Sequence, residues 1–363
     1  MKILQINKLY FPTIGGIETI VKIIAENLND DGKSVDVLAC QPKGKRRIEK
    51  INGVMTYKAA SLGKKFGMPI SFDFFFLFFR LRGHYDKFIL HFPFPLAALI
   101  APFIPKKKLL IYFHSDIIRQ KLGAFLFSPF IKFSLKHADK IFVSNSNLVT
   151  YSPLLRNYRD KCAVIPFGVD VSYNAGDREA AAALRSKYNN RTILLAVGRL
   201  VYYKGFEYAI EAMKSIDAQL LIIGTGPYKE KLDDLIIKNK VVDKVTILPP
   251  QADLKAFFLA CDIFIFPSVE PSEAFGLVQL EAMAAGKPVI NTILHTGVEE
   301  VSINGETGIT IPPRNGRAIS DAINNLLGNP VTRETYGAQA QLRYRRLYTE
   351  KIFIDRLKKV LKD

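Results

Sequence analysis

Residues 263–291 read IFIFPSVEPSEAFGLVQLEAMAAGKPVIN and contain a strand, a helix and a second strand in that order. The apolar run Ile263–Phe266 has the length of a buried strand, and Leu277–Ala285 is a run of helix formers that stops at Gly286. Pro288–Asn291 then begins the second strand. Strands joined by a crossover helix lie parallel in one sheet, so this stretch predicts an α/β protein.

The same alternation continues along the chain. Further strand-like runs, separated by amphipathic helical stretches, are Lys2–Ile6, Val35–Ala39, Lys87–His91, Lys108–Tyr112, Lys140–Val143, Ala163–Ile165, Ile193–Val197, Gln219–Ile223 and Val245–Leu248. At 363 residues the chain exceeds what one core usually fills, which favours two domains. We therefore expect two parallel sheets, each covered by helices on both faces, in domains 1–168 and 169–343.

Composition restricts the class of protein. Hydrophobic residues make up 48% and charged residues 23% of the chain, and the mean hydropathy is +0.09, which is typical of a globular protein. The three cysteines, Cys40, Cys162 and Cys261, are far apart and form no CxxC pair, which favours a reducing compartment over a disulfide or zinc framework. The N-terminal residues 1–6 read as a strand instead of a signal peptide, so a cytoplasmic location is expected.

Positive charge is concentrated in the first half of the chain. The net charge is +17, and residues 1–168 carry 26 Lys and Arg against 11 Asp and Glu, whereas the remainder carries 25 against 23. A basic half predicts an anionic partner, and both nucleic acid and a phospholipid surface or lipid phosphate qualify. Because the chain has no Trp and no recognised basic-aromatic module, a nucleic-acid-binding protein ranks below the membrane alternative.

Two glutamates within residues 263–291 carry the strongest functional signal. On one helix, eight steps of about 100° would leave Glu273 and Glu281 roughly 80° apart, so both reach one ligand more easily if Glu273 lies in a loop and Glu281 in the following helix. The helix then begins near Phe275 and Gly276, and its free amides and positive dipole end favour an anion such as phosphate. This combination suits a nucleotide sugar, and a core helix with an acidic start is the alternative.

Three other loops follow predicted strands, where ligands bind in parallel sheets. Gly15-Gly16 permits close backbone approach to a phosphate, with a simple turn as the alternative. Gly198-Arg199-Leu200 with Lys204-Gly205 places two cations at a strand end, which suits a diphosphate; solvated surface charges are the alternative. Gly224-Thr225-Gly226-Pro227 could admit a nucleotide, but it does not complete a dinucleotide fingerprint.

Together, in this order and over nearly the whole chain, these four motifs resemble the retaining glycosyltransferases of family four. The strongest part is Glu-Ala-Phe-Gly at residues 273–276 with the second glutamate at 281. The resemblance implies the glycosyltransferase B fold, in which two Rossmann-like parallel-sheet domains face each other across a cleft. It implies that the C-terminal domain binds the donor, that the N-terminal domain binds the acceptor, and that the chain from about Tyr344 returns to the N-terminal domain.

The same resemblance implies residue roles. Arg199 and Lys204 are expected to bind the donor diphosphate and stabilise its departing charge, and Glu273 to hold hydroxyls of the transferred sugar. Other residues expected to bind the donor are Gly15, Gly16, Gly224, Phe275, Gly276, Leu277 and Glu281, the last of these at the ribose. The chain contains no Asp-x-Asp, so neither a metal nor another cofactor is expected, and a donor phosphate oxygen can take the acceptor proton.

Two histidines end neighbouring predicted strands. His114 resembles the active-site histidine of the family near the donor sugar, with a buried structural histidine as the alternative. His91 is expected on the acceptor side, together with Glu18. The segments 91–96, 114–117 and 197–205 resemble a branch of bacterial mannosyltransferases that assemble surface polysaccharide from GDP-mannose, although nothing physical in them identifies guanine or mannose.

The segment Phe72–Phe79, followed by Arg80 and Arg82, is too short to span a bilayer, which needs about 20 apolar residues. A fully buried helix is the favoured interpretation, and an interfacial surface with arginines at headgroup level is the alternative. The leading hypothesis is a retaining hexosyltransferase, peripheral on the inner face of the plasma membrane, that transfers mannose to a lipid-linked glycan. Its rivals are a UDP-sugar-dependent enzyme of the same fold, a nucleotide-sugar epimerase or hydrolase, an inactive scaffold subunit and a non-enzymatic basic binding protein.

Overall fold

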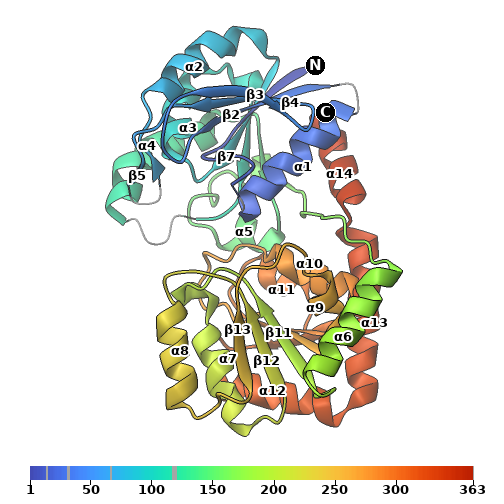
Figure 1. The fold of residues 1–363 in the computed structure, drawn as a ribbon. Coiled ribbons are helices and arrows are strands. Elements are labelled where there is room, and N and C mark those ends of the chain that lie inside the picture. The colour runs from blue at the N-terminus through green and yellow to red at the C-terminus, as the bar shows by residue number, and fades with distance from the viewer. Residues whose placement is uncertain (14, 31–32, 66–67, 117–120, 363) are drawn as a thin grey trace. The chain divides into compact units, whose positions relative to one another are not determined.

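The computed structural model describes residues 1–13, 15–30, 33–65, 68–116 and 121–362 (Figure 1). The chain forms two compact units: unit 1 comprises Met1–Phe167 with Phe353–Asp363, and unit 2 comprises Gly168–Ile352. The last segment of the chain therefore returns to unit 1 at Phe353. Within the described residues, no helix combines the length and the apolar character needed to cross a membrane.

Unit 1 is built on an eight-stranded sheet with the order β10-β9-β8-β7-β1-β2-β4-β3. The strands are β1 (Lys2–Ile6), β2 (Ser34–Cys40), β3 (Arg47–Ile51), β4 (Val54–Ala59), β7 (Lys87–Phe92), β8 (Leu109–Phe113), β9 (Lys140–Val143) and β10 (Cys162–Val164). Neighbours pair in parallel except β3 and β4, which are antiparallel. The expectation of a wholly parallel sheet is therefore wrong at this edge.

The antiparallel edge has a local cause. Asn52 and Gly53 connect β3 to β4 with φ values of 48° and 84°. An Asn-Gly pair with positive φ at both residues forms the tight turn that matches the twist of a hairpin. A short hairpin strand thus closes the sheet beyond β4.

Helices cover unit 1, and its core lies between them and the sheet. They are α1 (Gly16–Asp30), α2 (Asp73–Leu81), α3 (Pro95–Ile100), α4 (Lys121–His137), α5 (Ser146–Tyr151) and α14 (Glu350–Lys362), and a small hairpin is formed by β5 (Lys64–Lys65) and β6 (Met68–Pro69). Phe353 and Leu357 of α14 are fully buried, and the ring of Phe353 lies 5.9 Å from that of Phe167. The apolar face of α14 explains why the end of the chain belongs to unit 1.

Unit 2 contains a six-stranded, wholly parallel sheet with the order β13-β12-β11-β14-β15-β16. The strands are β11 (Ile193–Val197), β12 (Gln219–Ile223), β13 (Val245–Leu248), β14 (Ile263–Ile265), β15 (Val289–Thr292) and β16 (Gly308–Ile311). The helices are α6 (Ala175–Lys187), α7 (Phe206–Ala212), α8 (Lys229–Lys238), α9 (Lys255–Ala260), α10 (Leu277–Ala284), α11 (Gly297–Val301), α12 (Gly316–Gly328) and α13 (Pro330–Leu347). The βαβ unit β14-α10-β15 expected from residues 263–291 is confirmed.

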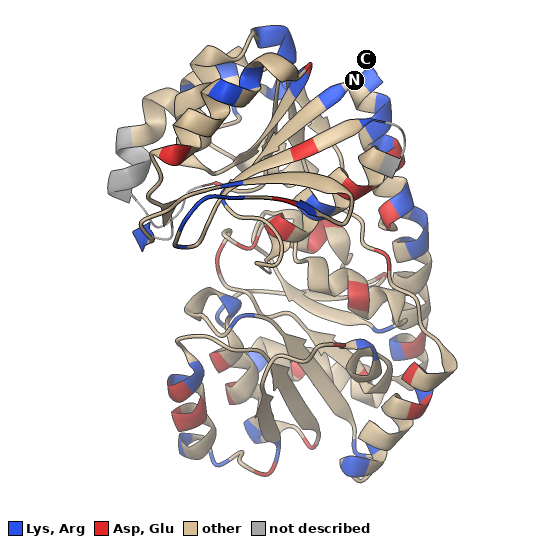
Figure 2. Ribbon diagram, turned by 45° about the horizontal axis from the view of Figure 1, so that its top comes forward, with Lys and Arg blue, Asp and Glu red and all other residues tan. Residues whose placement is uncertain are grey.

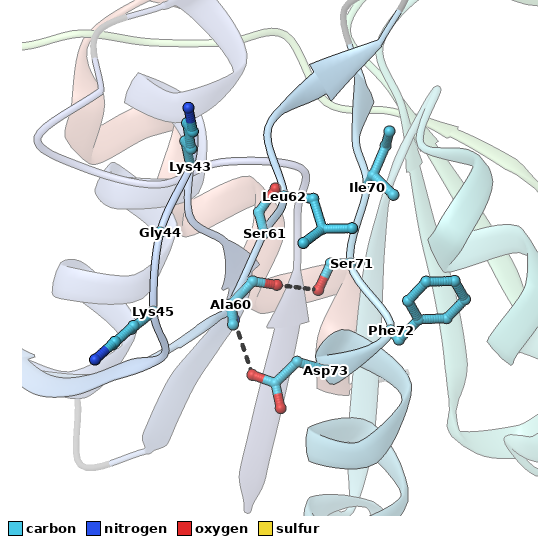
Figure 3. Close-up of a pocket in the computed structure, with 10 residues that line it drawn as sticks. All are labelled: Lys43, Gly44, Lys45, Ala60, Ser61, Leu62, Ile70, Ser71, Phe72 and Asp73. Atoms are coloured by element: carbon cyan, nitrogen blue, oxygen red, sulfur yellow. Dashed lines mark hydrogen bonds between the residues drawn. The ribbon is translucent and has the colours of Figure 1, made fainter.

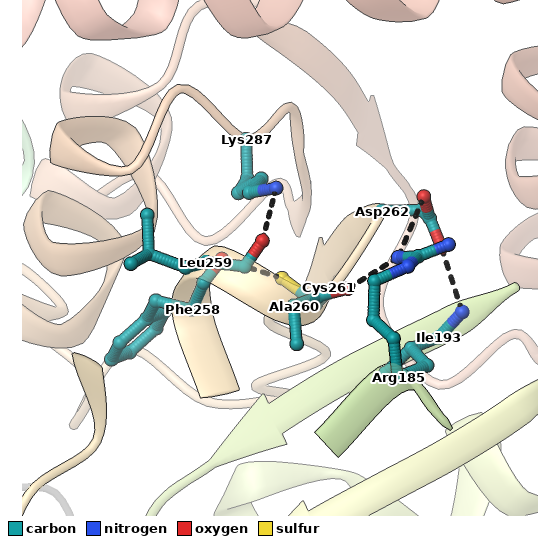
Figure 4. A network of polar contacts seen from close by, with 8 residues as sticks. All are labelled: Arg185, Ile193, Phe258, Leu259, Ala260, Cys261, Asp262 and Lys287. Carbon is teal, nitrogen blue, oxygen red and sulfur yellow. Dashed lines mark hydrogen bonds and ion pairs between the residues drawn. The ribbon is translucent and has the colours of Figure 1, made fainter. Parts of the chain in front are cut away.

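A polar network ties helices to the edge of this sheet where β11 and β14 begin (Figure 4). Arg185 of α6 donates to the carbonyl of Ala260 at 2.5 Å and pairs with Asp262, whose Oδ2 accepts from the amide of Ile193 at 2.8 Å. Lys287 donates to the carbonyl of Leu259 at 2.8 Å. Because ligands bind where parallel strands end, this network at their start is structural.

Candidate active site

Three loops of unit 2 leave the same edge of its sheet. Strand β11 lies between β12 and β14, and all three run parallel. The loops that follow them therefore begin side by side at the carboxyl edge of the sheet, where ligands bind in folds of this type. They contain Gly198 to Gly205, Gly224 to Pro227 and Pro267 to Gly276. The structure brings together the three sequence motifs of the C-terminal half.

Glycines let these loops touch each other through their backbones. A Cβ atom on Gly224 would overlap the carbonyl oxygen of Gly198. Gly205 has φ +66°, and a Cβ there would overlap the carbonyl oxygen of Pro267. Both contacts exclude any side chain, so these two glycines are required for the loops to pack against each other.

Lys204 and Glu273 meet where two of the loops converge. Lys204 Nζ lies 2.5 Å from Glu273 Oε2, and the two side chains are 12% and 13% exposed. Ser268 donates to the same Oε2 at 3.3 Å, and the Lys204 ammonium lies 4.9 Å from the centre of the Phe266 ring. Because both side chains are largely removed from water, each ion depends on the other for its hydrogen bond and its counter-charge.

Arg199 is exposed, in contrast to Lys204. Within the part of the chain that the structure describes, its guanidinium makes no hydrogen bond or ion pair. It stands on the same loop as Lys204, directly after Gly198. An arginine with a free planar fork beside a lysine is well suited to bind a diphosphate.

Helix α10 begins at this edge, as the sequence predicted, with Glu273 in the preceding loop and Glu281 inside the helix. Gly276 precedes the helix with φ 77° and ψ 64°, a left-handed conformation that turns the chain into it. Among the described residues, the amides of Gly276 and Leu277 have no acceptor. The structure therefore places unpaired amides at the start of α10, and the binding of an anion there stays a prediction.

Phe275, expected at the donor, has a largely buried ring, 6.1 Å from that of Tyr348. Its side chain therefore anchors the loop, and its carbonyl accepts from Gln279 Nε2 at 3.1 Å.

Glu281 is a partly buried carboxyl on α10. Burial raises its pKa from 4.5 to about 7, and the nearby charge of Asp253 adds to this effect. The backbone carbonyl of Glu281 accepts from the Tyr173 hydroxyl at 3.1 Å, which fixes this part of the helix. A carboxyl that lacks water gains most from new donors, and ribose hydroxyls are donors of the right kind.

The corresponding edge of unit 1 carries the other predicted residues. Strands β1, β7 and β8 are parallel neighbours, so the loops after them share one edge. Gly15 and Gly16 lie after β1 at the start of α1, and a Cβ on Gly15 would overlap Oε2 of Glu18. The Glu18 carboxylate therefore turns back over the glycine pair at the amino end of α1.

His91 and His114 form a buried chain with Gln5. His91 Nδ1 lies 2.9 Å from His114 Nε2, and His91 Nε2 lies 2.9 Å from Gln5 Oε1. The two imidazole rings are nearly coplanar, with an angle of 16° between them, and the Tyr112 ring is nearly parallel to both. His91 is 1% exposed and both its nitrogens are occupied, which places it behind His114 instead of on an acceptor surface.

Burial lowers the pKa of His114 to about 3 and holds that of His91 well below its ordinary value. Both rings are therefore neutral near pH 7. A neutral imidazole has one donor nitrogen and one acceptor nitrogen, so the hydrogen-bonded neighbours decide which is which.

Sequence reasoning missed Gln5 and Ser268, which contact His91 and Glu273 respectively. Gln5 did carry a signal, because it is a polar residue inside the apolar strand β1 and is fully buried. Ser268 carried none beyond its place in a loop. Among the described residues, no group of three or more His, Cys, Asp or Glu side chains could hold a metal ion.

Two sheet units, with polar loops gathered at the carboxyl edge of each sheet, have the architecture of the glycosyltransferase B fold, and the family matches identify the class of protein as a glycosyltransferase. The profile of "Glycosyltransferase Family 4" matches residues 14–173, and that of "Glycosyl transferases group 1" matches residues 177–343. The chain belongs to glycosyltransferase family 4.

The relatives of this chain are named after different transferred sugars. The chain is 28% identical to O-antigen chain mannosyltransferase C of Escherichia coli, over 98% of this chain and 96% of the relative. It is 30% identical to the D-rhamnosyltransferase WbpZ of Pseudomonas aeruginosa, over 96% and 92%. The crystal structure of HepE of Anabaena in complex with UDP shares the fold, with a TM-score of 0.82 and 18% identity over the full length of both chains.

Proposed function

We propose that the protein transfers a mannosyl residue from GDP-mannose, with retention of configuration and without a metal, to a lipid-linked glycan in O-antigen-like polysaccharide synthesis. The observation that carries this proposal is the Lys204–Glu273 pair, set beside Arg199 and the amino end of α10. A cation and a carboxylate in contact supply adjacent positions for a phosphate and for sugar hydroxyls. The mannosyltransferase and D-rhamnosyltransferase relatives support a mannose-like sugar.

In this reaction the bond from the anomeric carbon to the diphosphate breaks, and negative charge grows on the leaving oxygen. Lys204 and the amides of Gly276 and Leu277 stabilise that charge from fixed positions, and the exposed guanidinium of Arg199 adds a second cation. Glu273 orients the sugar through its hydroxyls. The acceptor oxygen forms the new bond to the anomeric carbon on the face that the diphosphate leaves, and its proton passes to a phosphate oxygen of the donor. No separate enzyme base is required.

A surface hollow in unit 1 is the observation that supports the proposal of a lipid-linked acceptor. It has a volume of about 490 Å³ and is lined by three segments, Lys43–Lys45, Ala60–Leu62 and Ile70–Asp73 (Figure 3). The first two follow β2 and β4, so the hollow opens on the same sheet edge as His114. Two lysines beside apolar side chains suit a ligand with a phosphate next to a hydrocarbon chain.

Helix α2 continues an apolar surface from this hollow. Phe74, Leu77, Phe78 and Leu81 are buried, as the sequence interpretation expected, but Phe72, Phe76 and Phe79 are 80%, 55% and 42% exposed. The expectation of a fully buried helix is therefore wrong, because the helix is apolar on two faces. Leu62, Ile70 and Phe103 are exposed as well. We call the six exposed side chains the apolar strip: Leu62, Ile70, Phe72, Phe76, Phe79 and Phe103.

Cations flank the apolar strip. Arg46 lies over the Phe76 ring at 4.9 Å and Arg82 over the Phe79 ring at 5.2 Å. The segment 41–82 contains ten Lys and Arg against two Asp and Glu, and Lys and Arg are blue in Figure 2. Exposed phenylalanines with arginines beside them are typical of a protein surface that inserts into the headgroup region of an anionic bilayer. This surface is the proposed membrane contact, on the inner face of the plasma membrane.

A donor panel tests the proposed activity. Binding and slow hydrolysis of GDP-mannose, its 6-deoxy analogue, UDP-glucose, UDP-galactose and UDP-N-acetylglucosamine are measured with the wild type and with Glu273→Ala. We expect GDP-mannose to be preferred and its hydrolysis to fall in the variant. A preference for a UDP-sugar contradicts the proposed donor, and hydrolysis that is unaffected by Glu273→Ala contradicts the role of that residue.

Sedimentation with vesicles tests the membrane contact. We expect binding to vesicles with anionic lipid at low salt, weaker binding at high salt, and at least tenfold weaker binding for the double variant Phe72→Ser, Phe76→Ser. Val331→Ser is the matched control, because Val331 is 78% exposed but lies in unit 2. Equal sedimentation of the double variant and the wild type excludes the strip as the contact.

A further inference from the structure

The chain Gln5–His91–His114 permits only one arrangement of protons. Gln5 Nε2 donates to the carbonyl of Val21 at 3.1 Å, which leaves Gln5 Oε1 as the atom that faces His91. A carboxamide oxygen only accepts, so His91 Nε2 carries a proton and donates it to Gln5. Rotating the amide by 180° would bring its oxygen against the Val21 carbonyl, which is also an acceptor.

The proton position on His91 also determines the proton position on His114. Because His91 is neutral and its proton is on Nε2, its Nδ1 has a lone pair and must accept from His114. His114 Nε2 therefore carries the proton of the second ring. His114 Nδ1 is left with a lone pair, and within the described residues it has no hydrogen-bond donor.

Among the described residues, the Nδ1 lone pair therefore has no hydrogen-bond partner, although the His114 side chain is only 4% exposed. Buried polar atoms are normally paired, and an unpaired one at the carboxyl edge of a parallel sheet marks a place for a ligand. The stacked rings of Tyr112 and Phe167, 4.9 and 5.6 Å from His114, keep the imidazole from turning to find another partner.

We propose that Gln5 and His91 are positioning residues that hold His114 in the Nε2–H tautomer, so that Nδ1 is a permanent acceptor for a hydroxyl group of the bound sugar. A ligand that presents a carbonyl or carboxylate oxygen at this position is rejected, because two acceptors would face each other. The inference rests on the proposed function only for the identity of the ligand. The tautomer itself is a property of the free protein.

Nitrogen-15 NMR of histidine-labelled protein tests the tautomer directly, because protonated and unprotonated ring nitrogens have well-separated shifts. The chain contains only five histidines, and signals are assigned by replacing them singly. We expect His114 to show a protonated Nε2 and an unprotonated Nδ1 between pH 6 and 8. A protonated Nδ1 in the wild type overturns the proposal.

The variant Gln5→Met tests the origin of the tautomer. It keeps an unbranched apolar side chain of similar size but removes the acceptor for His91, so we expect His91 to protonate on Nδ1 and His114 to follow in part. Gln219→Met is the matched control, because Gln219 is also a buried glutamine on a strand, 5% exposed, in unit 2. Should the His114 signals of Gln5→Met match those of the wild type and the control, Gln5 does not set the tautomer.

Ligand binding tests the acceptor role. When GDP-mannose, followed independently by calorimetry, saturates the protein, we expect the His114 Nδ1 signal to move upfield as the lone pair accepts a hydroxyl proton. We also expect kcat/KM of Gln5→Met to fall about tenfold, whereas Gln219→Met retains it. A donor that binds without moving the Nδ1 signal overturns the acceptor role. Failure of GDP-mannose to bind overturns the proposed donor, and the tautomer measurement still decides the part assigned to Gln5 and His91.

Discussion

Replacing Glu281 with Gln should stabilise unit 2 at alkaline pH and have a much smaller effect at acidic pH. Burial raises the pKa of this carboxyl from 4.5 to about 7, so the folded chain holds the proton more tightly than the unfolded chain does. The cost of ionising Glu281 is therefore absent below pH 4.5. It grows as the pH rises from 4.5 to about 7 and is complete above that value.

The size of the effect follows from the same two values. A tenfold change in a protonation equilibrium corresponds to about 1.36 kcal/mol, so the move from 4.5 to about 7 in the pKa of Glu281 corresponds to about 3 kcal/mol above pH 7. At pH 5 the cost is about 1 kcal/mol by the same relation. Glutamine is neutral at all pH values, so the stability gained by Glu281→Gln should grow by about 2 to 3 kcal/mol between pH 5 and pH 8.5.

Urea unfolding at both pH values measures this difference. The chain has no Trp, so far-UV circular dichroism is the suitable probe, and the transition that contains unit 2 is the one to compare. Glu334→Gln, at an exposed position of the same unit, controls for the loss of one negative charge. If Glu281→Gln changes the free energy of unfolding equally at pH 5 and pH 8.5, the carboxyl is not desolvated and the reasoning fails.

Three other substitutions separate chemistry from stability. Lys204→Met leaves Glu273 without its counter-ion and removes a cation from the proposed diphosphate position, so single-turnover transfer should be at least about 100-fold slower. Gly276→Ala puts a Cβ into a left-handed backbone and against the Phe266 ring, so urea unfolding should show a loss of about 1 to 3 kcal/mol, whereas Gly328→Ala, where no atom lies within 4 Å, should lose almost nothing. Asp262→Asn breaks the charge pairing with Arg185 and should lower the thermal midpoint by several degrees without changing KM, as measured by calorimetry and steady-state kinetics.

Much of the fold could be predicted because strands that are buried on both faces are marked by composition alone. Lys2–Ile6, Lys140–Val143, Ile193–Val197, Gln219–Ile223 and Val245–Leu248 have the predicted ends, and the ends of the other predicted strands agree or differ by one residue. The missed strands had weaker signals. Strand β3 is mostly exposed and reads as a charged loop, and it becomes a strand only because the Asn52-Gly53 turn folds it against β4.

The residues of the candidate site also differ in whether the sequence alone predicts them. Local signals, namely glycine spacing, a cation after a strand and a carboxylate before a helix, were enough to identify Lys204, Glu273 and the amino end of α10. Contacts between distant segments were not, because no spacing encodes them. Gln5 and His91 are 86 positions apart in the sequence, and only the parallel pairing of β1 with β7 brings their side chains within 2.9 Å.

The Lys204–Glu273 pair also bears on how the site treats its ligands. Two partly buried charges in contact at 2.5 Å neutralise each other, so a ligand that binds only one of them leaves the other without a counter-ion. A nucleotide diphosphate alone satisfies Lys204 but offers nothing to Glu273. A nucleotide sugar satisfies both, because its phosphates meet the cation while its hydroxyls donate to the carboxylate. We therefore expect the intact donor to bind more tightly than the product nucleotide, and the pair to re-form once the sugar has been transferred, which favours release of the product.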